Sequence, residues 1–197
     1  MAGGLTLAKV KTKTELPLAS IPLLFGIQQA IEGAVWLSFG SPILNTIAIY
    51  AYSTFSHVLW PIFVPISVLL IETDQARKKV LYLFFFVGLA IGLYLLYFIV
   101  FDPITARIVE NGIAYDSPHL YPWVTMTLYL VATCGSCLFS SHKIINVFGV
   151  VLFFSFFIAG WFYNATFYSV WCFFAAILSA IIYWYFIRNS MHDSSPL

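Results

Sequence analysis

The sequence predicts an all-α fold, a polytopic transmembrane helical bundle, because of its composition and the length of its apolar segments. Of the 197 residues, 61% are hydrophobic and 9% are charged, whereas soluble domains carry about a quarter charged residues. The apolar residues fall in runs of about 20, the length that a helix needs to cross roughly 30 Å of hydrocarbon. The runs lack the alternation of a membrane barrel, and helices satisfy their own backbone hydrogen bonds in lipid. We therefore expect six full spans and a partial N-terminal helix.

The chain divides into a short N-terminal segment, a bundle and a tail. Residues 1–16 begin with "MAGGLTLAKV", which is too short for a span and predicts either a partial, interfacial helix or a frayed end. Residues 17–188 form the transmembrane bundle, and residues 189–197 form a cytoplasmic tail. The spans are expected at approximately 17–39, 43–71, 80–101, 121–140, 144–163 and 166–187.

Basic residues are distributed unequally between the two sides of the bundle. Eight of the nine Lys and Arg residues precede the first span or follow the second, fourth and sixth spans, and only Arg107 lies on the other side. The positive-inside rule makes the basic side cytoplasmic. We expect an integral membrane protein with Arg77–Lys79, Lys143 and the C-terminus in the cytoplasm.

The one long loop, residues 102–122, faces the opposite side in this arrangement. Its Pro, Asn-Gly and Asp-Ser-Pro signals favour turns over a separate domain. The stretch "PITARIVENGIAY" alternates like a strand, so a small hairpin with Asn111-Gly112 at its turn is one expectation. Such a hairpin would form a lid over the outer mouth of the bundle, and a plain connector is the alternative.

A weak internal similarity suggests a repeat. "TFSHVLWPIFVPISVLL" from Thr54 resembles "TFYSVWCFFAAILSAII" from Thr166 after a one-residue offset. Counting the partial N-terminal helix as the first gives a 3+1+3 seven-helix plan with parallel halves, an arrangement known among transporters. Aromatic-rich spans also resemble one another by chance, and chance is the alternative interpretation.

The first span contains an ionisable residue where lipid makes a charge costly. Gln28, Gln29 and Glu32 lie within the apolar run from Pro17 to about Phe39, and a charge in hydrocarbon costs at least roughly 2.5–3.5 kcal/mol. Gln28 and Glu32 are four residues apart, so they share one helical face, with Gln29 beside them. We expect this face to turn toward a protein interior or a cavity.

The second span offers polar partners for that face. Ser53, Ser56 and His57 come together in "YSTFSHVLWP", and a tilt or a kink at Pro61 would bring His57 toward Glu32. These groups predict a site for a proton or a small polar solute; the alternative is that they only bind neighbouring helices together. Because Ser56 and His57 are adjacent, a regular helix points them about 100° apart, which makes them a poor nucleophile–base pair.

No catalytic residue, metal site or cofactor is predicted. A net charge of +1 and the lack of a basic cluster with interleaved aromatics exclude nucleic acid as a partner. "CGSC", Cys134–Cys137, has the spacing of a redox or metal motif. It lies within an apolar span, however, where small residues serve close helix packing. We therefore interpret this motif as a packing feature.

Three functional hypotheses remain open. The leading one is a small proton-linked transporter or permease, with Glu32 as the titrating group and Gln28, Gln29 and His57 around it. The second is a non-catalytic subunit of a larger membrane complex. The third, an intramembrane hydrolase or thiol oxidoreductase, is disfavoured because neither nucleophile geometry nor metal-ligand count is met. Besides the lipid bilayer, the expected partners are a proton or small polar solute and either a membrane-complex partner or further copies of the chain.

Three segments taken together, "IPLLFGIQQAIEGAVWLSF", "FSHVLWPIFVP" and "SVWCFFAAILS", resemble a family of uncharacterised bacterial multi-pass membrane proteins, a domain of unknown function. The resemblance runs from Glu15 to Ile187 and includes the two glutamines and the glutamate of the first span. It implies a bacterial inner (plasma) membrane and a longer N-terminal apolar segment that completes a seventh helix. Because this chain begins with "MAGGL", we expect its first helix to be truncated or absent. The resemblance implies no biochemical activity.

Overall fold

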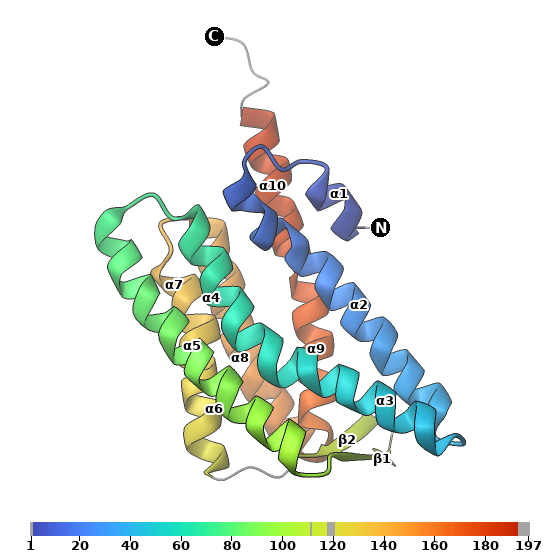
Figure 1. Ribbon diagram of the computed structural model, residues 1–197. Helices are drawn as coiled ribbons and strands as arrows, with labels where there is room; N and C mark the ends of the chain where they lie inside the picture. Colours follow the sequence, from blue (N-terminus) through green and yellow to red (C-terminus); the bar gives the residue numbers. More distant parts are fainter. Residues whose placement is uncertain (1, 111, 118–120, 193–197) are drawn as a thin grey trace.

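The computed structural model describes residues 2–110, 112–117 and 121–192, and it is a helical bundle as predicted (Figure 1). Within these residues, six helical stretches are long and apolar enough to cross a membrane, which indicates an integral membrane protein. Each predicted span overlaps one of these stretches. They are Lys13–Ser38, Pro42–Ile71, Gln75–Phe101, Pro122–Phe139, Lys143–Phe162 and Asn164–Arg188.

The stretches are built from shorter helical elements, with η1 and η4 as 3₁₀ turns and η2 and η3 as π-helical turns. The elements in chain order are α1 (Ala2–Leu7), η1 (Lys13–Glu15), α2 (Leu16–Ser38), α3 (Pro42–Ser53), η2 (Thr54–Leu59), α4 (Trp60–Ile71), α5 (Gln75–Phe101), β1 (Thr105–Val109), β2 (Gly112–Asp116), α6 (Pro122–Leu130), η3 (Val131–Gly135), α7 (Ser136–Phe139), α8 (Lys143–Phe162), η4 (Asn164–Thr166), α9 (Phe167–Leu178) and α10 (Ala180–His192).

The first helix, α1, and the end of the last helix, α10, lie at the same end of the bundle (Figure 1). The short helix α1 is the predicted partial N-terminal helix, and it packs against α2 and α10. Helix α10 continues to His192, beyond the predicted end of the sixth span. The rest of the predicted tail, residues 193–197, lies outside the described residues.

The starts of several helices follow from local chemistry. Pro42 and Pro122 each stand at the beginning of a helix, where the missing N–H has no intrahelical partner to lose. Asp74 caps α5, because its side chain accepts hydrogen bonds from the backbone N–H groups of Ala76 (2.8 Å) and Arg77 (3.1 Å). These three residues therefore mark the starts of the second, third and fourth spans.

Helices α4 and α5 pack with almost no space between them at a glycine. A Cβ atom added to Gly88 of α5 would lie 1.8 Å from the carbonyl oxygen of Pro61 in α4. One turn later, a Cβ on Gly92 would lie 2.7 Å from the Ile62 side chain. Small residues that let helix backbones approach closely are a usual means of packing helices in membranes. This contact fixes the second span against the third.

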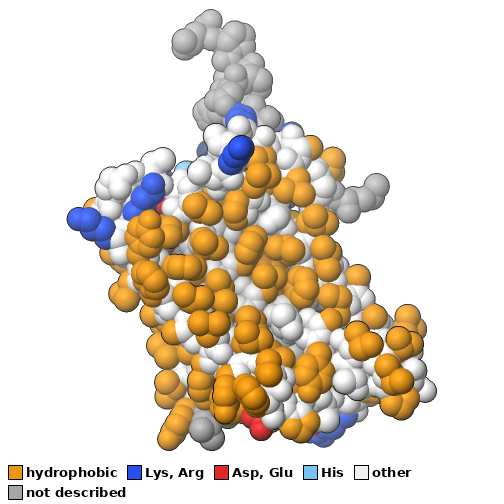
Figure 2. Space-filling view, viewed as in Figure 1, with side chains coloured by type: hydrophobic (Ala, Val, Ile, Leu, Met, Phe, Trp, Pro, Cys, Tyr) orange, Lys and Arg blue, Asp and Glu red, His pale blue; other side chains and the backbone are white. Residues whose placement is uncertain are grey.

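We call the end of the bundle that carries α1, the end of α10 and most Lys and Arg residues the basic end, and the opposite end the hairpin end. Figure 2 shows most visible Lys and Arg side chains at the basic end, above a band of hydrophobic side chains. The basic-end residues are Lys9, Lys11, Lys13, Arg77, Lys78, Lys79, Lys143 and Arg188.

A buried acid, Glu72, connects two loops at the basic end by hydrogen bonds: its own loop before α5 and the loop that contains Ser141. It is 1% exposed. One carboxylate oxygen accepts from the backbone N–H of Ser141 (2.7 Å), and the other accepts from the Ser141 hydroxyl (2.7 Å) and the N–H groups of Thr73 (2.9 Å) and Asp74 (3.1 Å). Burial acts to raise the pKa of Glu72, but the hydrogen bonds from Ser141, Asp74 and Thr73 outweigh it and lower the pKa.

The loop at the hairpin end contains an antiparallel pair of strands. This confirms the expected hairpin, for which a plain connector was the alternative. Strands β1 and β2 pair in register from Thr105↔Asp116 to Val109↔Gly112; Asn111, predicted for the turn, lies outside the described residues. In β2, the first four residues are buried, whereas β1 is mostly exposed. Strand β2 is therefore part of the bundle packing, against α9 and η4.

Candidate functional site

Glu32 faces the interior of the bundle, as its spacing predicts. The side chain is 6% exposed, whereas Leu37 on the same helix is 91% exposed. The half-buried Gln29 donates from Nε2 to Oε2 of Glu32 at 3.3 Å, and the hydroxyl of Ser169 in α9 lies beside the carboxyl group. Among the described residues, the buried Oε1 atom of Glu32 has no hydrogen-bond partner. The acid thus sits between α2 and α9 with one oxygen available.

Gln28, one turn from Glu32, is fixed by a tryptophan. Gln28 is fully buried, and its Oε1 accepts a hydrogen bond from Nε1 of Trp60 in α4 at 2.6 Å. The Trp60 ring stacks on Phe25 of α2, with ring centroids 3.8 Å apart. Because the amide oxygen is held by the indole, the Nε2 group points elsewhere, and it has no partner among the described residues. Gln28 therefore offers a buried donor.

Ser53, Ser56 and His57 lie where the second span departs from α-helical geometry. In the π turn η2, the backbone N–H of Trp60 bonds to the carbonyl of Phe55, five residues back, instead of to that of Ser56. Residue 61 is a proline without an N–H, so it cannot bond to the Ser56 carbonyl either. The released carbonyl accepts a hydrogen bond from the hydroxyl of Tyr129 in α6 at 2.8 Å.

The expectation that Ser56 and His57 point apart is wrong. The Ser56 Oγ atom lies 2.7 Å from Nδ1 of His57, and both side chains are buried. The expectation assumed regular helical rotation, and the π turn changes the local geometry. His57 also packs against the ring of Tyr168 in α9, at 4.7 Å between centroids. Ser53 is fully buried, and its Oγ has no partner among the described residues.

Several groups in the site were not anticipated as functional from the sequence. Tyr52 of α3 donates to the carbonyl of Tyr168 at 3.1 Å. Its ring stacks on Tyr115 of β2, with centroids 4.4 Å apart and an interplanar angle of 7°. Cys172 of α9 lies close to Tyr52 and Gln28. Nothing in their local sequence pattern separates these residues from ordinary packing residues.

Tyr115 brings a phenol from the hairpin to the acid. Its hydroxyl is buried and has no hydrogen-bond partner among the described residues. Burial raises the pKa of Tyr115 above its ordinary value, and the nearby carboxyl of Glu32 raises it further. The phenol therefore keeps its proton and acts as a donor. Together, Glu32, Gln28 and Tyr115 form a polar cluster. It presents one free carboxylate oxygen, a free amide N–H donor and a free phenol O–H donor.

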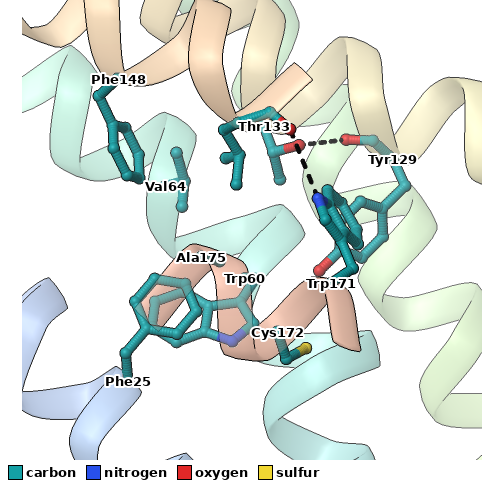
Figure 3. Close-up of a pocket in the computed structure, with 10 residues that line it drawn as sticks. Phe25, Trp60, Val64, Tyr129, Thr133, Phe148, Trp171, Cys172 and Ala175 are labelled. Atoms are coloured by element: carbon teal, nitrogen blue, oxygen red, sulfur yellow. Dashed lines mark hydrogen bonds between the residues drawn. The ribbon is translucent and has the colours of Figure 1, made fainter. Parts of the chain in front are cut away.

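A small apolar cavity lies on the basic-end side of this polar cluster. Its volume is about 20 Å³, room for about one water-sized molecule. Figure 3 shows the stacked rings of Phe25 and Trp60 on one side of the cavity, Trp171 and Tyr129 on another, and Cys172 between them. Cys172 and Trp60 border both the cavity and the polar cluster.

The CGSC motif is a tightly packed part of the bundle. Cys134 and Cys137 are each 1% exposed and carry free thiols. A Cβ added to Gly149 of α8 would lie 2.6 Å from the Cβ of Cys137, so the helices touch there. Within the part of the chain that the structure describes, no three His, Cys, Asp or Glu side chains are grouped to hold a metal ion.

Comparison with known proteins finds one family. The model of a family described as "Family of unknown function (DUF6629)" matches residues 1–196 of the chain. No curated protein and no solved structure matches the chain.

Proposed function

Since the chain belongs to DUF6629, a family of unknown function, we propose its function from its own residues: a small proton-linked transporter or permease with its site at Glu32. The observation that supports this proposal is the burial of an acid with one unpaired oxygen inside an apolar bundle. An ionisable group at such a depth is costly, and in membrane proteins it usually marks a proton or solute site. An amide at this position would join the helices without the cost of a titrating group.

The charges around the site restrict what it binds. None of the nine Lys and Arg side chains is buried, so no permanent positive charge lies in the bundle interior to neutralise an anion beside Glu32. The groups without a hydrogen-bond partner among the described residues include a carboxylate oxygen of Glu32, the donors of Gln28 and Tyr115, and the hydroxyl of Ser53. We infer a proton, alone or with a small neutral or cationic solute that makes hydrogen bonds, and we exclude anionic substrates.

His57 and the serines are secondary members of this site. His57 contacts Ser56 at 2.7 Å, which extends the polar groups from Glu32 into η2. Gln28 is held in position by Trp60. In this proposal Glu32 exchanges the proton, Gln28 and Gln29 orient the carboxyl group or its occupant, and His57 and Ser56 continue the polar path.

The basic end is proposed to face the cytoplasm and the hairpin end the outside of a bacterial inner membrane. Eight of the nine basic residues lie at the basic end, and the positive-inside rule assigns that end to the cytoplasm. Cysteine residues introduced beside Arg77 and beside Arg107 test this orientation. Only the second should react with an impermeant thiol reagent in intact cells; labelling of the first alone would reverse the assignment.

Proton flux in vesicles tests the function. Purified protein is reconstituted with an entrapped pH dye, and a potassium diffusion potential drives protons across the membrane. We expect flux above that of protein-free vesicles for the wild type and for Glu15→Gln, a control that changes a carboxyl group outside the bundle interior. Glu32→Gln should reduce the flux to the protein-free level.

If Glu32→Gln folds and conducts like the wild type, the acid has no part in transport. If the wild type itself conducts no more than protein-free vesicles, the polar cluster acts as interhelical glue, in keeping with a structural subunit of a larger membrane complex.

A further inference from the structure

Tyr115 lies between the buried acid and an open depression at the hairpin end. The depression has a volume of about 500 Å³ and is lined by Pro103, Thr105, Tyr115, Asp116 and Ser117. Tyr115 is also stacked on Tyr52 and close to Glu32. One side chain therefore borders both the surface depression and the polar cluster.

Strand β2 holds Tyr115 in this position. Ile113, Ala114 and Tyr115 are 0%, 2% and 6% exposed, although they belong to a loop between two spans. Gly112 approaches η4 so closely that an added Cβ would lie 2.8 Å from the Cβ of Thr166. The strand is held in place by apolar packing, by the ring stack and by this close approach. The phenol hydroxyl of Tyr115 contributes no hydrogen bond to a described residue.

A buried hydroxyl without a partner needs an explanation. Leaving a polar group unpaired in the interior is costly, and most buried polar atoms find a partner in protein or water. A phenylalanine would fill the same space against Tyr52 without this cost. The hydroxyl is therefore best explained by an occupant of the site, which it contacts when the site is filled.

The opposite side of the polar cluster is closed by apolar groups. Phe25 and Trp60 stack at 3.8 Å, and the cavity beyond them, about 20 Å³ in volume, is lined almost entirely by hydrophobic and aromatic side chains. Such a cavity does not attract a polar molecule. The polar route out of the site thus leads toward Tyr115 and the hairpin end.

We propose that Tyr115 is a ligand-contacting gate of the Glu32 site: its phenol donates a hydrogen bond to the occupant, and its movement away from Tyr52 opens the site to the depression at the hairpin end. This inference rests on the proposed function. The occupant must both accept hydrogen bonds, from Tyr115 and Gln28, and donate one, to Glu32. It is therefore a small neutral hydrogen-bonding molecule, of which water is the smallest.

Two sets of variants in the proton-flux assay test this gate. Tyr115→Phe removes the hydroxyl and keeps the ring stack, and we expect flux to fall about two- to tenfold, the effect of one neutral hydrogen bond. Tyr97→Phe, which alters a lipid-facing tyrosine that is 56% exposed, is the matched control and should conduct like the wild type.

The second set locks the strand. Gly112→Cys with Thr166→Cys places two thiols close enough for a disulfide after a shift of about 1 Å, since bridged Cβ atoms lie about 3.5–4.5 Å apart. The oxidised double variant should lose its flux and regain it on reduction, while each single variant is insensitive to the redox state.

The outcomes separate the gate from the function of the site. If Tyr115→Phe equals Tyr97→Phe and oxidation of the double variant changes nothing, while Glu32→Gln still abolishes flux, the gate is refuted and the acid keeps its role. If Glu32→Gln conducts like the wild type, the proposed function fails and the gate fails with it.

Discussion

Replacing Glu72 with glutamine should lower the stability of the folded protein by an amount that follows from the hydrogen bonds of this side chain. The carboxylate accepts four hydrogen bonds, three at one oxygen and one, from the backbone N–H of Ser141, at the other. In Glu72→Gln the amide oxygen can keep the set of three, but the amide NH₂ then faces the N–H of Ser141. The variant therefore loses one hydrogen bond to a charged acceptor, worth about 1.5–3 kcal/mol.

The assay is thermal unfolding of the purified protein in detergent. For a chain of this length, 1 kcal/mol shifts the midpoint by about 2–4 °C, so the expected loss is about 3–12 °C. Asp74→Asn is the matched control in the same loop. Asp74 caps α5, and asparagine caps a helix about as well as aspartate, so its midpoint should stay within about 2 °C of the wild type.

The pH dependence of this difference provides a second check. The hydrogen bonds lower the pKa of Glu72 in the folded protein below its ordinary value of 4.5. The stabilisation is therefore complete above pH 4.5 and is lost as the pH falls through the lowered pKa. The gap between wild type and Glu72→Gln should narrow below about pH 4.5. Equal midpoints at neutral pH, or a gap that widens in acid, would refute this reasoning.

Two further changes test the packing that positions the site. Trp60→Phe keeps a ring beside Phe25 but leaves the Oε1 of Gln28 without its donor, so unfolding should become easier by about 1–3 kcal/mol; an unchanged midpoint would show that the bond is not formed. Gly88→Ala forces a methyl group onto the Pro61 carbonyl and should prevent recovery of a monodisperse protein, whereas Gly26→Ala, which meets nothing within 4 Å, should behave like the wild type in size-exclusion chromatography.

The spans and the inward orientation of the acid could be predicted because each depends on local pattern. A run of about 20 apolar residues can only be a buried or membrane helix. The basic residues lie between or outside these runs, so they mark where the spans end. Gln28 and Glu32 share a face because four residues make about one helical turn. The cost of a charge in lipid then turns that face inward, and the structure buries both residues.

The remainder of the site depends on tertiary contacts that a single sequence does not encode locally. The π turn at Ser56 is stabilised by Tyr129, a residue 73 positions away. Tyr115 reaches the acid only because β2 inserts into the bundle, although the alternation of the loop did predict a strand. Glu72 follows directly after an apolar helix, where an acid is usually an exposed loop charge, and its burial depends on the loop that contains Ser141.

The central claim, that Glu32 is a buried acid that exchanges a proton with water, is tested most directly by pH-difference infrared spectroscopy of the protein in lipid. We predict a carboxylic acid carbonyl band that appears as the pH is lowered, shifts when the sample is exchanged into D₂O, and is absent from Glu32→Gln. An identical difference spectrum for the variant, or a Glu32 band that does not shift in D₂O, would show a sealed acid that only holds helices together and would contradict the account.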